Sequence, residues 1–73
     1  MDRLKFKETM SRILKQPVDR LADDAVLNNL VTDSFVLIDM VIELQEEFEK
    51  FLVQDDLKDV KTVGDLVSAF EAK

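Results

Sequence analysis

The chain of 73 residues contains no Cys, His, Trp or Tyr. Without Cys, neither a disulfide nor a thiolate metal ligand can form. The absence of His and Cys also removes the usual general base, the usual thiol nucleophile and most metal ligands. A catalyst would have to be built from carboxylates, Lys, Ser and Thr alone, so we expect a protein that is not an enzyme.

Glycine and proline occur once each. So few turn-forming residues leave little material for β-hairpins, and the composition therefore indicates helices. No apolar run approaches the length that crosses a membrane, and the charged N-terminal stretch MDRLKFKETM is unlike a signal peptide. We therefore expect a protein located in the cytoplasm. Because 47% of the residues are hydrophobic and 36% are charged, we expect one small globular domain over residues 1–73.

Acidic residues outnumber basic ones: the chain has sixteen Asp and Glu but ten Lys and Arg, and its formal net charge is −6. Such a balance argues against a nucleic-acid partner, which requires clustered Lys and Arg, and favours partners with basic surfaces. The acidic pairs Asp23-Asp24 and Asp55-Asp56 lack the alternating ligands, the central Gly and the terminal Glu of a calcium loop. We therefore expect no metal site.

Helical spacing of apolar residues predicts the first part of the fold. Phe6, Met10 and Ile13 recur at i, i+4 and i+7, and Pro17 is expected to stop this first helix. Residues 16–33 then form a long connection whose aliphatic residues follow no helical period. A loop of this length is usually functional or packed down by its own side chains.

Capping residues predict the second part of the fold. Thr-Asp-Ser before the next apolar period indicates a helix that begins around Asp33 or Ser34 and runs to about Glu49. The segment QDDLKDV has room for one short turn of helix. A last helix starts at Thr62, where Thr-Val-Gly-Asp resembles a capping box with Asp in the Glu position.

Together these elements predict an all-α fold, a small antiparallel four-helix bundle with three main helices, a short third helix and a long loop between helices 1 and 2. Residues of the long loop should close the open side of the core. The expected core consists of Phe6, Met10, Ile13, Leu37, Met40, Val41, Leu44, Phe48, Leu66, Val67 and Phe70.

The second helix has two apolar faces. One is the stripe formed by the expected core residues of this helix. When the helix is projected at about 100° per residue, Phe51 also falls on this stripe. Phe35, Ile38 and Ile42 fall on the opposite side, beside Ser34. At a helix N-terminus, free backbone N–H groups and the macrodipole favour a negative group such as a phosphate ester. By its position alone, Ser34 is either a helix cap or a modified residue.

Asp33-Ser34-Phe35, followed by VLIDMVIELQEEF, resembles the phosphopantetheine-attachment region of acyl carrier proteins, which reads Asp-Ser-Leu before an apolar helix ending in a Glu-Glu-Phe-like run. The resemblance extends over the whole chain, including the Thr-Val-x-Asp-Leu entry to the last helix. It implies a four-helix bundle that holds acyl groups as thioesters on a 4′-phosphopantetheine arm derived from coenzyme A. It also implies that Ser34 is the attachment site and that the phosphopantetheinyl transferase recognises Asp33.

The same resemblance implies that successive enzymes dock on the exposed side of the second helix. Phe35, Ile38 and Ile42 match apolar docking positions, and Asp39 and Glu46 match acidic ones. We expect basic docking patches on the transferase and on acyl-transferring and synthase enzymes, and a monomeric carrier that does not insert into membranes. Alternatively, the three apolar residues pack against the long loop or the third helix.

Two positions depart from the family pattern. Val31 stands where Gly is usual, so the loop must reach Asp33 without glycine's freedom at positive φ. Val36 replaces the acidic residue that is common in carriers of primary fatty-acid synthesis, which favours a polyketide or other specialised pathway. The initiating Met and the absence of linker tails predict a free-standing protein. Two alternatives stay open at this point: a helical adaptor with Ser34 unmodified, and an aminoacyl or peptidyl carrier.

Overall fold

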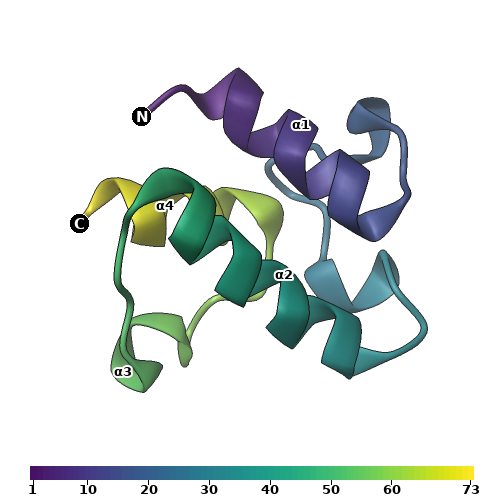
Figure 1. The fold of residues 1–73 in the computed structure, drawn as a ribbon. Coiled ribbons are helices and arrows are strands. Elements are labelled where there is room, and N and C mark those ends of the chain that lie inside the picture. Colours follow the sequence, from purple (N-terminus) through teal and green to yellow (C-terminus); the bar gives the residue numbers. More distant parts are fainter.

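The computed structural model describes all 73 residues, and its regular elements are all helical (Figure 1). They are α1 (Arg3–Leu14), the 3₁₀ turns η1 (Val18–Arg20) and η2 (Leu27–Asn29), α2 (Ser34–Phe48), α3 (Gln54–Leu57) and α4 (Val63–Glu71). The predicted all-α class, the three main helices with a short third one, and the long first connection are confirmed. No helix is long and apolar enough to cross a lipid bilayer.

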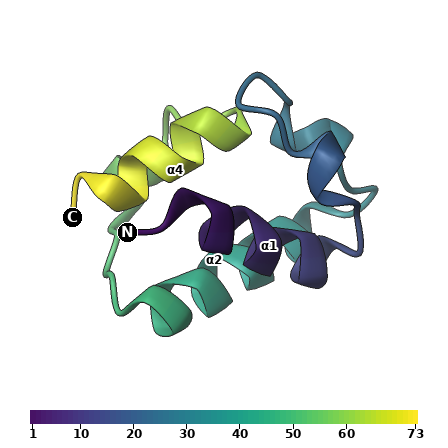
Figure 2. The same ribbon diagram turned by 90° about the horizontal axis from the view of Figure 1, so that it is seen from above.

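The three main helices run roughly parallel or antiparallel to one another. Seen from two sides, α1 runs opposite to both α2 and α4, so that α2 and α4 run the same way (Figures 1 and 2). The connection between α2 and α4 contains α3 and brings the chain back to the starting end. The two termini lie at one end of the bundle, where the Arg3 guanidinium donates to both carboxylate oxygens of Glu71 at 2.9 and 2.6 Å.

The ends of α1 follow from local sequence. Asp2 caps its start, because the Asp2 Oδ1 accepts from the backbone N–H groups of Leu4 and Lys5 at 3.0 and 3.2 Å. The helix ends at Leu14, where the next residue, Lys15, takes a left-handed conformation with φ 57°. The end of α1 thus precedes Pro17, the residue expected to stop it.

The start of α4 is held by its own cap and by the long loop. The Asp65 N–H donates to Thr62 Oγ1 at 3.1 Å, and Asp65 Oδ2 accepts from the Thr62 N–H at 3.2 Å, which is the predicted capping box. The Gly64 N–H donates to the Asp23 carbonyl at 2.9 Å. A Cβ on Gly64 would lie 2.9 Å from that same oxygen, so glycine is what lets the loop approach this closely.

The long loop contributes three buried leucines to the core, as predicted for its aliphatic residues. They are Leu21, Leu27 and Leu30. Val31 needs no glycine-like freedom, because the positive φ values of the chain belong to Lys15 and Glu49. The loop therefore reaches Asp33 without the glycine that is usual in the family.

One hydrophobic cluster of thirteen buried residues joins the helices and the loop. It consists of Phe6, Met10, Leu14, Leu21, Leu27, Leu30, Met40, Leu44, Leu52, Val63, Leu66, Val67 and Phe70. Phe6 links α1 to the other main helices, since its ring centroid lies 5.2 Å from that of Phe48 and 5.0 Å from that of Phe70. Four residues of the predicted core are only partly buried against this cluster: Ile13, Leu37, Val41 and Phe48.

The placement of Phe51 on the inward stripe of the second helix is wrong. Its side chain is 79% exposed. The helix ends at Phe48, and Glu49 takes a left-handed conformation with φ 53°, so the helical projection no longer applies beyond this point. Leu52, the next residue in the sequence, is 5% exposed and belongs to the core instead.

Candidate functional site

Ser34 is the first residue of α2, and it is exposed. The residue that caps the helix is Asp33, whose Oδ1 accepts a hydrogen bond from the Phe35 N–H at 2.9 Å. Because Asp33 performs the capping, the Ser34 hydroxyl is not needed for it and makes no hydrogen bond within the protein. The two predicted residues thus lie side by side, and Ser34 presents a free hydroxyl at the positive end of a helix dipole.

Acidic residues are concentrated on and around α2. Residues 21–49 hold eight of the sixteen acidic residues and none of the ten basic ones. Of the three salt bridges, only that between Lys7 and Asp23, at 2.9 Å, involves this segment, and its hydrogen bond lowers the pKa of the Asp23 carboxyl. The other seven carboxylates of the segment form no salt bridge, so the segment carries a net negative charge.

The side of α2 that faces away from the core carries the predicted docking residues, and we call these five residues the outer face. The exposed fractions of Phe35, Ile38 and Ile42 are 70%, 53% and 49%. Asp39 and Glu46 are exposed on the same helix. The structure therefore brings together the apolar and acidic residues selected from the sequence, in the form of an apolar patch with charged neighbours.

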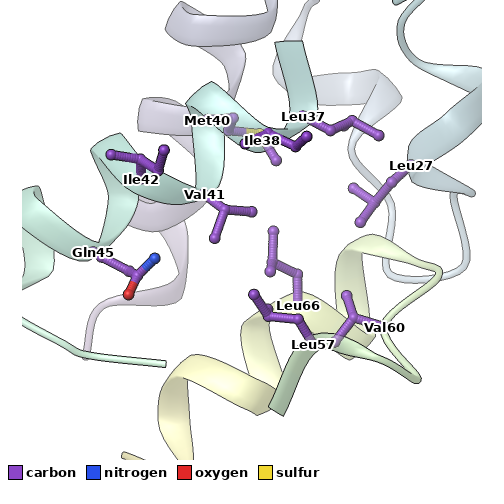
Figure 3. A pocket seen from close by; sticks show the side chains of 10 residues that line it. All are labelled: Leu27, Leu37, Ile38, Met40, Val41, Ile42, Gln45, Leu57, Val60 and Leu66. Carbon is purple, nitrogen blue, oxygen red and sulfur yellow. The ribbon is translucent and has the colours of Figure 1, made fainter. Parts of the chain in front are cut away.

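A cavity of about 330 Å³ lies between α2, η2, α3 and α4 (Figure 3). Gln45 is the single polar residue of its lining, which otherwise consists of Leu27, Leu37, Ile38, Met40, Val41, Ile42, Leu57, Val60 and Leu66. Ile38 and Ile42 belong both to this lining and to the outer face. Neither residue is among those packed against the core cluster, so the alternative expectation, that they pack against the long loop or the third helix, is not confirmed.

This cavity was not predicted from the sequence. Leu27 comes from the long loop, and Leu57 and Val60 come from the short third helix and the turn after it. None of these residues belongs to a periodic pattern long enough to place it opposite α2. Only the tertiary arrangement brings them together, so no local signal could have revealed the cavity.

Comparison with known proteins identifies the family. The model of the phosphopantetheine attachment site family matches residues 5–70. Over 70 residues, the chain is 33% identical to the acyl carrier protein of Thermotoga maritima. The aligned region covers 94% of this chain and 86% of the relative. The chain belongs to the acyl carrier protein family.

Two further acyl carrier proteins show the same similarity. That of Exiguobacterium sibiricum is 30% identical over 59 residues, covering 81% of this chain and 75% of the relative. That of Lactobacillus acidophilus is 29% identical over 65 residues, covering 88% of this chain and 81% of the relative. Acyl carrier proteins have no catalytic activity of their own, and they work with a phosphopantetheinyl transferase and with biosynthetic enzymes.

The cofactor of this acyl carrier protein family is 4′-phosphopantetheine, and the residues at the start of α2 fit such a group. The exposed Ser34 hydroxyl offers an oxygen for a phosphodiester, and the N-terminus of a fifteen-residue helix stabilises its negative charge. When bound, the group supplies a terminal thiol, which this Cys-free chain lacks. No cluster of three or more carboxylates in the structure could hold a metal ion.

Proposed function

We propose that this protein carries acyl groups on a 4′-phosphopantetheine arm attached to Ser34, and that residues 1–73 form one carrier domain. The observation that supports this most strongly is the division of roles at the start of α2. Asp33 caps the helix, and the neighbouring Ser34 hydroxyl is exposed and without a hydrogen-bond partner. A serine that only capped the helix would use its own oxygen for the backbone.

The attachment step needs only this hydroxyl from the carrier. The Ser34 Oγ forms a bond to the phosphorus that bears pantetheine in coenzyme A. The bond from that phosphorus to the rest of the diphosphate breaks, adenosine 3′,5′-bisphosphate leaves, and the hydroxyl proton passes to a base of the transferase. We also propose a cytoplasmic location, which agrees with the use of coenzyme A, an intracellular compound, as the source of the arm.

We further propose that the outer face of α2 docks the transferase and the acyl-transferring and synthase enzymes. Its apolar side chains give short-range contact, and the unpaired carboxylates of residues 21–49 favour partners with basic docking patches. We expect the carrier to act as a monomer, since a carrier that dimerised through this face would block its own partners.

The cargo that the site favours is an acyl group. Nine of the ten residues that line the cavity beside α2 are hydrophobic, and a hydrocarbon chain suits such a lining better than the charged ammonium of an aminoacyl group. Val36, in place of the usual acidic residue, favours a polyketide or related specialised pathway over primary fatty-acid synthesis.

Intact mass spectrometry tests the attachment. The apo-protein is incubated with coenzyme A and a broad-specificity phosphopantetheinyl transferase. We expect the wild type to gain the mass of one phosphopantetheine and the Ser34→Ala variant to gain none. A wild type that stays at its apo mass, with a transferase that modifies a known carrier in the same tube, would leave the unmodified adaptor as the better assignment.

A further inference from the structure

Phe51 is the most exposed large hydrophobic residue of the chain, with 79% of its surface open to solvent. Its backbone is nevertheless held on both sides. The Lys50 N–H donates to the Gln45 carbonyl at 3.1 Å, and the Leu52 N–H donates to Gln45 Oε1 at 3.0 Å. Because Leu52 itself is buried, the Phe51 ring is presented outward from a fixed position.

This ring lies beside the outer face of α2. Phe51, Ile42 and Glu46 line the same surface hollow between the last turns of α2 and the residues that follow it. The apolar patch that begins with Phe35 therefore continues past the end of the helix. A single exposed phenylalanine needs no explanation, but one that extends an existing patch forms part of a larger contact surface.

We propose that Phe51 is a second anchor for the phosphopantetheinyl transferase, at the end of α2 opposite Ser34. This inference rests on the proposed function. The transferase is the one partner that must recognise the carrier before any arm exists. An enzyme that acts on the loaded carrier can also bind the arm and its acyl group, whereas the transferase depends on the protein surface alone.

Charge and size both fit this occupant. The transferase must bind coenzyme A, a polyanion, so the entrance to its active site is cationic and complements the acidic segment 21–49. From Ser34 to Phe48, α2 is about 21 Å long at 1.5 Å per residue. A standard interface buries about 800 Å² per partner, which as a disc is roughly 32 Å wide. One such interface covers both Ser34 and the region of Phe51.

The test is the rate of arm attachment by a broad-specificity phosphopantetheinyl transferase at saturating coenzyme A and varied apo-carrier concentration. We expect Phe51→Ser to raise the KM for the carrier about tenfold, as loss of an interface anchor does, with little change in kcat. The matched control is Leu4→Ser in α1, where another large hydrophobic residue, 61% exposed, lies outside the outer face. Phe51→Leu should restore most of the wild-type KM.

Thermal melts of the variants should be alike, because both side chains are exposed. Equal KM values for Phe51→Ser and Leu4→Ser would overturn the inference while leaving attachment at Ser34 intact. A wild type that gains no arm would overturn the proposed function and this inference with it. Sedimentation that shows a wild-type dimer, dissociated by Phe51→Ser, would assign Phe51 to a second copy of the chain instead.

Discussion

The helices α4 and α2 are both amphipathic, yet they distribute their apolar residues differently. Of the nine residues of α4, four are buried, and none of its large hydrophobic residues is exposed. Of the fifteen residues of α2, only Met40 and Leu44 are fully buried, and three large hydrophobic residues face solvent. Helix α4 stabilises the fold, whereas α2 both stabilises the fold and presents an apolar surface to solvent.

This difference has a thermodynamic meaning. Burying an aliphatic or aromatic side chain contributes roughly 1.5–3 kcal/mol, and the outer face of α2 forgoes most of that contribution for Phe35, which is 70% exposed. In a chain of 73 residues, whose net stability is on the order of 5–10 kcal/mol, this is a substantial loss. It becomes intelligible if the residue is buried against a partner.

The largest expected effect separates the two faces of α2. Leu44→Ala should lower the free energy of unfolding by roughly 2–5 kcal/mol, because the side chain is fully buried and its loss leaves a cavity. Ile38→Ala, at a site that is 53% exposed, should cost clearly less stability but weaken transfer to and from partner enzymes. Denaturant melts beside an acylation assay measure both. Equal stability losses would mean that Ile38 belongs to the core.

A smaller effect is expected at the start of α4, the helix assigned to stability. Gly64→Ala gains helix propensity of up to about 1 kcal/mol, but its Cβ would lie 2.9 Å from the backbone oxygen of Asp23. Since a backbone atom cannot move aside cheaply, we expect a net destabilisation of roughly 1–2 kcal/mol. Arm attachment at Ser34 should be unchanged. A variant as stable as the wild type would show that the loop at Asp23 is free to shift.

The capping box of α4 predicts an acid-dependent loss of stability. Hydrogen bonds from the backbone N–H groups of Lys61 and Thr62 hold the pKa of Asp65 below its ordinary value of 3.8. The carboxylate therefore stabilises the fold at pH values above 3.8, and this contribution is lost as the pH falls through the lower pKa of the folded state.

The unfolding free energy of wild type and Asp65→Asn, measured from pH 6 downward, checks this. The gap between the two proteins should be largest at pH 6, begin to narrow at about pH 4 and close as the pH falls through the lowered pKa of Asp65. Taking the difference removes the effect of the other carboxylates, including those that repel one another around α2. A gap that stays constant with pH would mean that the charge of Asp65 does not matter.

The smallest effect on stability is expected at the acidic edge of the outer face. Glu46→Lys should lower the association rate with the transferase, as added salt does, because complementary charges steer the encounter and are screened over about 10 Å at 0.1 M. The melting temperature should hardly change, since exposed charges contribute at most about 1 kcal/mol. Glu8→Lys in α1 is the matched control. If the stopped-flow association rates respond to neither salt nor Glu46→Lys, the acidic residues of this face contribute to solubility and not to docking.

The elements with the strongest local signals were predicted from the sequence. Thr62 and Asp65 marked the start of α4, and the residues around Asp33 marked the start of α2, because caps are made by side chains close in sequence. The outer face of α2 followed from a fifteen-residue helix whose period is unambiguous. The structure added that Asp33 alone performs the capping beside Ser34.

The features that were not predicted depend on unmarked helix ends or on tertiary contacts. Both left-handed residues that end the long helices, Lys15 and Glu49, are neither Gly nor Asn, the residues that usually announce such a turn. Although the second helix was predicted to end at about Glu49, the projection extended the helical period to Phe51 and placed that residue inward. The cavity beside α2 depends on how the loop and α3 fold back, which no local pattern encodes.

The central claim, that Ser34 carries the arm, is tested most directly by locating the group on the chain. Trypsin cleaves after Lys and Arg, and residues 21–49 contain neither, so the peptide 21–50 includes Ser34 as its single serine. After arm attachment, fragmentation of this peptide should place one phosphopantetheine on Ser34. The same group found on a peptide with Ser11 or Ser68, or on no peptide at all, would contradict the account.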